Sequence, residues 1–379
     1  MFKRELGISV YPEKFTKQET KKYILLAKKY GFNKMFLSFL QLAGFSLDKG
    51  VEDKEFMKNK SIYEEIIKFA KDNNFYVVVD VNSKCLEMTK SSSYDLSYYQ
   101  DLGIDCLRLD MPLSPIEIAM ITQEWNLDIQ LNASMNDHIL DDVLYCKPIA
   151  YKISGCHNFY PLANTGLAWN YFLKCSEKYF KKGVRLSAFI GSETGEVGPW
   201  KDKVGPLVTI DNHRCNEIDV QAQELWATGM ISDLYIGNQP ASESELEKLS
   251  QINRYKFQFE ILLEDDLSVI EQKTIFDLKH FNRGDINDHF IRSMMGRIIF
   301  KNEKGIKKPL DKNHVFNLGD VVIVNETYDN YKYELLIVTE DGFSNFNGTV
   351  NLVGKIPKKH HNLIKMVGPW DTFEFKITN

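Results

Sequence analysis

Short apolar runs alternate with amphipathic stretches along the first two-thirds of the chain. The clearest run, residues 75–82, is nearly unbroken in its apolar character, which is typical of a strand covered on both faces. Between such runs, apolar side chains recur at helical spacing, as Tyr23, Leu26, Ala27 and Tyr30 do. This rhythm predicts strands that alternate with helices.

The pattern predicts eight strands, at residues 6–12, 34–40, 75–82, 106–111, 128–134, the opening part of 150–161, 184–190 and 233–237. The helices expected between them include residues 16–31, a segment ending near 69–71, 94–103, a segment starting at Ser114, 166–183, 220–229 and a last one capped by Ser242. A long loop is expected over residues 191–216.

Eight strand–helix units over about 250 residues match the size of a (β/α)8 TIM barrel. A doubly wound sheet is the alternative, because periodicity does not show whether a sheet closes. Since no Gly-x-Gly-x-x-Gly follows a predicted strand, a dinucleotide-binding fold gains no support.

After about Asn253 the rhythm changes to strands separated by turns, with a helix or two around residues 268–276. The expected strands there are residues 257–261, 320–324, 333–338, 349–353 and 373–377. We therefore expect a barrel domain over residues 1–253 and a small, mainly antiparallel β domain over residues 254–379.

Composition narrows the classes of partner. The 379 residues carry a net charge of -5, so the broad basic surface of a nucleic-acid-binding protein is not expected. No apolar run approaches the roughly 20 residues of a membrane helix, and the first residues enter a strand with no room for a signal peptide. The six cysteines are scattered without a Cys-x-x-Cys pair, which favours reduced thiols in a cytoplasm over zinc or disulfides.

Polar side chains gather where the predicted strands end, which is where a barrel places its working residues. These strand-end residues are Tyr11, Ser38, Asp80, Asn82, Asp110, Asn132, Ser134, His157, Asn158, Asn238 and Gln239. Hydroxyl, amide and carboxyl groups dominate, as suits a sugar. The clustered His and Asp of a metal hydrolase and a strand-end Schiff-base lysine are both missing, so no metal or other cofactor is expected.

Asp80 and Asp110 end neighbouring strands, so their carboxyl groups are expected to lie close together. Two nearby carboxylates push their pKa values apart, which leaves one as an acid and the other as a base or nucleophile, as glycosidic cleavage requires. The alternative is that one of them pairs with Arg108, on the same strand face as Asp110. Asp211 is a third candidate acid, or else a turn residue.

Basic residues offer sites for an anion, each with a structural alternative. One interpretation of His157 is that it binds a hydroxyl or phosphate group of the ligand, and the other is that it is a buried structural histidine. Because Asn158 follows it directly at a strand end, the functional interpretation is favoured. His213 and Arg214 form a candidate anion clamp, or a solvated loop pair. Residues 292–293 and 325–327 are interpreted first as turn residues and second as ligand contacts.

With these residues assembled, the chain resembles the outer-surface-protein-like bacterial proteins grouped with 6-phospho-N-acetylmuramidases of MupG type. The similarity extends over essentially the whole chain, and Cys-His-Asn-Phe-Tyr-Pro at residues 156–161 is its most specific part. The other matching stretches are residues 7–11, 107–110, 131–134, 165–167, 188–190, 213–214, 236–238, 291–293, 319–323, 333–335 and 353–357.

The resemblance implies an N-terminal TIM barrel, a C-terminal cyclophilin-like β domain, and cytosolic hydrolysis of N-acetylmuramic acid 6-phosphate linked to N-acetylglucosamine during cell-wall recovery. Asp110 is then nucleophile or base, and Asp80 or Asp211 the acid. The candidate substrate-binding residues are Ser9, Tyr11, Asn132, Ser134, His157, Asn158, Tyr160, His213, Arg214, Asn238 and Arg292.

Two other functions remain open on the same barrel: a phosphosugar lyase or epimerase, and a phosphosugar-binding protein without catalysis. The expected partner in every case is a small phosphorylated sugar, with neither nucleic acid nor membrane. A homodimer is also left open.

Overall fold

The computed structural model describes residues 2–49, 54–111, 113–200, 205–308, 314–344 and 348–378. The chain divides into two compact units, Met1–Gln251 and Ile252–Asn379. Each unit is built on a sheet of its own. Within the described ranges, no helix is long and apolar enough to cross a membrane.

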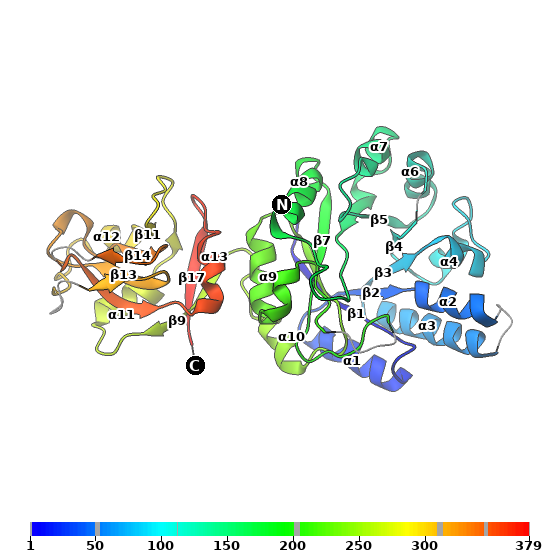
Figure 1. Ribbon diagram of the computed structural model, residues 1–379, viewed down its shortest axis with the longest axis horizontal. Coiled ribbons are helices and arrows are strands. Elements are labelled where there is room, and N and C mark those ends of the chain that lie inside the picture. Colours follow the sequence, from blue (N-terminus) through cyan, green and yellow to red (C-terminus); the bar gives the residue numbers. More distant parts are fainter. Residues whose placement is uncertain are drawn as a thin grey trace. The chain divides into compact units, whose positions relative to one another are not determined.

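The first unit is a closed barrel in which each strand pairs in parallel with the next and β1 closes against β8. Figure 1 shows its strands with helices around them. The strands are β1 (Glu5–Ser9), β2 (Lys34–Ser38), β3 (Tyr76–Val81), β4 (Cys106–Leu109), β5 (Asp128–Asn132), β6 (Ile153–Cys156), β7 (Arg185–Ile190) and β8 (Asp233–Ile236). The predicted eight-stranded barrel is confirmed, and the doubly wound alternative is wrong.

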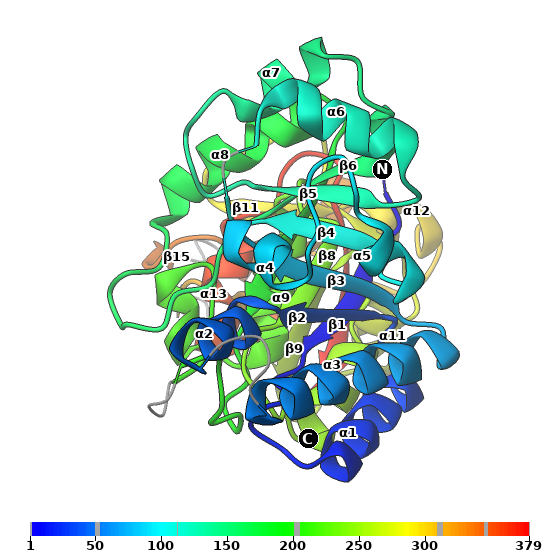
Figure 2. The same cartoon turned by 90° about the vertical axis from the view of Figure 1, so that its right-hand side faces the viewer.

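Helices surround these strands (Figure 2). They are α1 (Lys17–Lys29), α2 (Leu40–Lys49), α3 (Lys54–Asp72), α4 (Ser83–Met88), α5 (Ser97–Asp101), α6 (Pro115–Glu124), α7 (Ile139–Tyr145), α8 (Trp169–Lys181), α9 (Ile218–Ala227) and α10 (Glu243–Ser250). Capping boxes begin three of them, at Thr16, Ser114 and Ser242, because each serine or threonine is followed three residues later by a glutamate that bonds back to it.

A compact set of side chains from several strands fills the barrel interior: Phe36, Val78, Cys106, Cys156, Phe189 and Tyr235. Gly7 on β1 leaves the space for this filling. A Cβ atom at that position would lie 2.5 Å from the Tyr235 ring, so any larger residue would force the ring to move.

The structure ends several strands of this unit earlier than predicted, and at two predicted strand boundaries the residues are helical instead. Leu40 was expected to end the second strand, but β2 stops at Ser38 and Leu40 opens helix α2. The Ser38 hydroxyl accepts a hydrogen bond from the Leu40 amide at 3.2 Å, which turns the chain into the helix. Residues 150–152 form a 3-10 turn instead of the start of β6. Of the loop expected over residues 191–216, residues 201–204 lie outside the described part.

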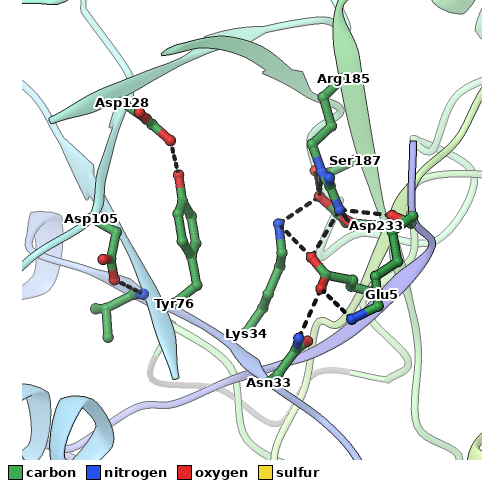
Figure 3. A network of polar contacts seen from close by, with 11 residues as sticks. Glu5, Asn33, Lys34, Tyr76, Asp105, Asp128, Arg185, Ser187 and Asp233 are labelled. Atoms are coloured by element: carbon green, nitrogen blue, oxygen red, sulfur yellow. Dashed lines mark hydrogen bonds and ion pairs between the residues drawn. The ribbon is translucent and has the colours of Figure 1, made fainter. Parts of the chain in front are cut away.

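Charged side chains that begin the strands join into one network at the amino-terminal end of the barrel (Figure 3). Lys34 Nζ lies 2.8 Å from Asp233 Oδ2 and 3.5 Å from Glu5 Oε2, and Arg185 Nη2 donates to Glu5 Oε2 at 2.9 Å. Beside them the Tyr76 hydroxyl donates to Asp128 Oδ2 at 2.5 Å. These mutually paired charges hold the strand starts together.

The second unit has a seven-stranded sheet in the order β10-β17-β9-β16-β13-β14-β11, and a two-stranded sheet of β12 and β15. All pairs are antiparallel except β9 with β17, so the mainly antiparallel prediction is confirmed. The strands are β9 (Phe257–Leu263), β10 (His280–Phe281), β11 (Phe290–Ser293), β12 (Val315–Phe316), β13 (Asp320–Val324), β14 (Leu335–Val338), β15 (Phe343–Ser344), β16 (Val350–Lys355) and β17 (Thr372–Ile377). The helices are α11 (Val269–Phe276), α12 (Met295–Ile299) and α13 (His361–Ile364).

Residues 292–293 were interpreted as turn residues and instead lie on β11, where Arg292 pairs with Leu336 of β14. β11 is too short for its alternation of buried and exposed positions to be recognised in the sequence. In the structure the side chains of Ile291 and Ser293 are buried, whereas that of Arg292 is partly exposed. This alternation is what a half-covered strand requires.

Candidate active site

A cavity of about 240 Å³ opens at the carboxyl ends of the barrel strands, where barrel enzymes place their catalytic groups. The register β2–β3–β4 sets Ser38, Asp80 and Arg108 side by side, so all three reach the cavity at one level. The full lining is Phe36, Ser38, Leu40, Gln41, Asp80, Arg108, Asp110, Asn158, Phe159, Phe189, Pro199 and Trp200.

Arg108 is the centre of the polar side of this cavity. Its Nη1 lies 2.6 Å from Asp80 Oδ1 and 3.9 Å from Asp110 Oδ1, so those two carboxylate oxygens are at most about 6.5 Å apart, the sum of the two distances. Its Nη2 donates to Asn158 Oδ1. The ion pair weighed as an alternative does form, and it forms with Asp80.

The two carboxylates have different surroundings. The Asp80 side chain is 11% exposed and that of Asp110 is 43% exposed. Burial raises the pKa of Asp80, with the Arg108 guanidinium opposing that rise and the nearby Asp110 charge adding to it. A buried carboxyl group with a raised pKa beside an exposed carboxylate is the division that acid–base catalysis uses.

Aromatic rings form the other wall. The Phe159 ring centroid lies 4.7 Å from that of Phe189 and 5.8 Å from that of Trp200, both edge-to-face. Trp200 is 42% exposed. An exposed indole above a polar floor offers the apolar face on which a sugar ring packs, while carboxylates and amides take its hydroxyls.

His157 lies at the end of β6 but is completely buried. Its Nε2 pairs with the Ser176 hydroxyl at 2.9 Å, its Nδ1 lies 3.4 Å from the Ser134 hydroxyl, and its ring packs 4.7 Å from Phe172. Burial lowers the pKa of His157 to about 3, so the ring is neutral at ordinary pH. These contacts favour the structural alternative for His157, while Asn158 beside it lines the cavity.

Asp211 and Arg214 bond to each other and to the loops around them. Arg214 Nε donates to Asp211 Oδ1 at 2.9 Å, and its other nitrogens donate to the carbonyls of Pro206, Tyr160 and Leu162. Burial would raise the pKa of Asp211, but the bonds from Arg214 and from the Gly166 amide outweigh it and lower that pKa. Asp211 therefore suits a loop anchor better than a proton donor.

His213 is the other residue of the predicted anion clamp. Its side chain is buried, and its Nε2 lies 3.0 Å from Glu224 Oε2. Neither basic residue is among the described side chains lining the cavity. An anion clamp at this pair therefore has no support from the geometry.

Four other predicted ligand-binding residues are buried, and three of them hold strand ends and loops. Tyr11 is buried and its hydroxyl donates to the Gly237 carbonyl at 2.5 Å. Asn238 is buried and bonds to four backbone groups of the loops after β7. Ser9 and Ser134 are buried as well, the latter accepting from the Asn158 amide at 2.8 Å.

Tyr160 and Asn132 lie close to the strand ends. Tyr160 forms an isolated bridge with Val208, and burial raises the pKa of its hydroxyl. Asn132 Oδ1 accepts from the Ser134 amide at 2.9 Å. Arg292 belongs to the second unit, where it bonds Glu334 at 3.1 Å and lies over the Tyr331 ring.

Gln41 and Trp200 are among the lining residues that were not singled out from the sequence. Gln41 stands in the first turn of α2, directly after the residue predicted to end the second strand, and Trp200 lies in the long loop. The sequence does offer a signal for Trp200, which is a tryptophan placed directly after Gly and Pro residues in a predicted loop. Among the described residues no three His, Cys, Asp or Glu side chains cluster as metal ligands would.

Sequence comparison matches both units to one family. Residues 6–251 match the N-terminal region of 6-phospho-N-acetylmuramidase and residues 257–376 match its C-terminal region. The chain belongs to the 6-phospho-N-acetylmuramidase family. This family is one of glycoside hydrolases, so the predicted resemblance and enzyme class are confirmed.

Solved structures resemble this 6-phospho-N-acetylmuramidase family member along its whole length. An uncharacterized protein from B. cereus is 35% identical, with 99% of this chain and 100% of that chain covered at a TM-score of 0.86. A conserved protein of unknown function from Enterococcus faecalis is 21% identical over 99% of this chain and 97% of that chain, with a TM-score of 0.68. The second likeness concerns the fold alone. No curated protein matches the chain.

Proposed function

We propose that this protein hydrolyses the bond between N-acetylmuramic acid 6-phosphate and N-acetylglucosamine, in the cytoplasm and during cell-wall recycling. The observation that carries the proposal is the pair of unlike carboxylates in the barrel mouth, in a chain whose two units both match the 6-phospho-N-acetylmuramidase family. The aromatic wall supports a sugar as the ligand.

Each carboxylate takes a role suited to its surroundings. Asp110, the more exposed, is the nucleophile or base that approaches the anomeric carbon. Asp80, whose pKa burial raises, is the proton donor to the leaving oxygen. Arg108 holds Asp80 in place, and its guanidinium is the one basic group among the described lining residues, so we place the anionic muramyl sugar on its side.

The carboxylate spacing supports retention of configuration at the anomeric carbon. Retaining glycosidases hold their two carboxyl groups about 5 Å apart, whereas inverting enzymes need about 6.5–9.5 Å to admit a water molecule. The limit of about 6.5 Å set by Arg108 lies at the short edge of the inverting range. We expect proton NMR of the early product to show the anomer of the substrate, and appearance of the opposite anomer first would contradict this assignment.

The deciding experiment compares a synthetic 6-phosphorylated muramyl disaccharide with its unphosphorylated twin. We expect release of free N-acetylglucosamine from the phosphorylated compound only, with one oxygen from ¹⁸O-labelled water in the muramyl product. Turnover without that oxygen would instead indicate a lyase or epimerase. Binding by calorimetry with no turnover would indicate a phosphosugar-binding protein, and either result would refute the proposal.

A further inference from the structure

A second cavity of about 420 Å³ lies beside the first, between the loops that follow β4 and β5. Its lining is Leu109, Asp110, Met111, Leu113, Ile118, Leu131, Asn132, Met135, Asp137 and Ile139. Of the described residues that line either cavity, Asp110 alone lines both. The exposed carboxylate therefore stands at the junction of the two cavities.

Such a junction has a chemical meaning in a glycosidase, because the enzyme must hold one sugar on each side of the bond that breaks at its carboxylates. We propose that the second cavity binds the leaving N-acetylglucosamine, with the muramyl 6-phosphate sugar in the first. This inference rests on the proposed function and adds to it the residues that recognise the leaving group.

Charge decides which sugar each cavity takes. The second cavity is lined by two carboxylates, Asp110 and Asp137, and its described lining holds no Lys, Arg or His. The first cavity is also lined by two carboxylates, Asp80 and Asp110, but its Arg108 guanidinium offsets part of their charge. A sugar bearing a phosphate and a lactyl carboxylate is therefore repelled more strongly in the second cavity than beside Arg108 in the first, whereas N-acetylglucosamine is neutral.

The volume and lining of the second cavity suit a neutral acetamido sugar. Its volume lies within the range of about 300–1,000 Å³ of small-molecule sites. Buried Leu109, Ile118 and Leu131 form an apolar floor for the acetamido methyl group and the C–H face of the ring. The Asn132 oxygen is taken by the Ser134 amide, so its amide nitrogen is the group left to donate to an acetamido oxygen.

The test uses two substrates that differ only in the leaving group: the 6-phosphorylated muramyl disaccharide and the 4-nitrophenyl glycoside of the same muramyl sugar. The variant is Met135→Ala, because Met135 is 59% exposed and its truncation leaves the core intact. Leu113→Ala is the second variant, from the loop on the other side of the cavity. Met57→Ala is the matched control, an exposed methionine on α3 away from both cavities.

We expect each cavity variant to lower the ratio of kcat/KM for the disaccharide to kcat/KM for the nitrophenyl glycoside by about tenfold, as loss of an apolar contact in a pocket does. Inhibition of the nitrophenyl reaction by free N-acetylglucosamine is expected to weaken in parallel. The control is expected to keep the wild-type ratio and inhibition.

The outcomes separate the two proposals. If the wild-type protein cleaves both substrates and the variants keep its ratio and its inhibition by N-acetylglucosamine, the second cavity does not bind the leaving sugar and only this inference is overturned. If the wild-type protein cleaves neither substrate, the proposed function fails, and the inference fails with it.

Discussion

At the scale of single residues, Asp80 and Asp110 show how burial divides one chemistry between two identical side chains. Both lie near the same Arg108 nitrogen, yet one is almost enclosed and the other is nearly half exposed. Burial favours the neutral form of a carboxyl group, because the charged form loses its hydration. In the proposed mechanism, these surroundings distinguish the acid from the nucleophile.

Asp110→Asn is expected to lower kcat on the phosphorylated disaccharide by at least about 100-fold, because an amide neither attacks the anomeric carbon nor accepts a proton. The melting temperature should stay near that of the wild-type protein, since the side chain is well exposed. Asp101→Asn, at an exposed position on α5, serves as the control. Wild-type turnover in Asp110→Asn would remove Asp110 from the mechanism.

Asp80→Asn is expected to abolish the alkaline limb of the pH profile of kcat/KM. Because burial raises the pKa of Asp80, its proton is present below that raised value and is lost as the pH rises through it, so activity should fall on the alkaline side. Asp80→Glu should restore part of the activity together with the limb. A variant Asp80→Asn that is active with an unchanged alkaline limb would show that another group donates the proton.

At the scale of elements, the loops after β7 depend on one amide side chain at the end of β8. Asn238 accepts from the amides of Ser192 and Leu207 and donates to the carbonyls of Ser192 and Gly195. The same connection carries Pro199 and Trp200 to the cavity. Asn238, at the end of β8, therefore positions the loop that carries Trp200, because it bonds to the backbone of that loop.

Asn238→Ala is expected to lower the melting temperature by several degrees, because it leaves buried backbone groups unpaired at about 1–3 kcal/mol each. KM for the disaccharide should rise as the Trp200 wall loses its support, with kcat less affected. Asn302→Ala, at an exposed position, is the matched control for the loss of an amide. An unchanged KM in a clearly destabilised Asn238→Ala protein would separate this loop from substrate binding.

At the scale of the whole barrel, its two ends have different tasks. Lys34 begins β2 within the ion network of Figure 3, while Ser38 ends the same strand in the cavity proposed as the active site. Residues at the amino-terminal end of a barrel serve stability, and those at the carboxyl end serve chemistry. Mutations at the amino-terminal end should therefore change the free energy of unfolding, and mutations at the carboxyl end should change kcat.

Lys34→Met is expected to reduce the free energy of unfolding by about 3–5 kcal/mol, because it leaves Asp233 and Glu5 with fewer partners in a buried site. At a temperature where the variant stays folded, kcat should match that of the wild-type protein. Lys29→Met, which removes an exposed ion pair with Glu243, is the control and should lose little stability. A large loss of kcat in folded Lys34→Met would contradict the division between the two ends.

Local periodicity in the sequence was sufficient for the strand–helix rhythm, the eight strands of the first unit and the mainly antiparallel second sheet, because hydrophobic spacing reflects which face of an element is buried. Closure of the eight strands into a barrel was seen only in the structure. Periodicity also pointed to Asp80, Asp110 and Asn158 as strand-end residues, and these line the cavity. It failed where an apolar segment suits either a strand or a buried helix, as at Leu40, and on a strand as short as β11.

Only the tertiary structure decided which polar side chains are available to a ligand. His157 and Asn238 follow strands as Asp110 does, and Arg214 lies in the loop after β7, yet internal partners occupy all three. Arg108 pairs with Asp80 in preference to Asp110. The sequence shows that a side chain stands near a strand end, whereas its partners come from segments distant along the chain. Burial and pairing depend on those partners, so the identity of the exposed carboxylate was decided by the fold.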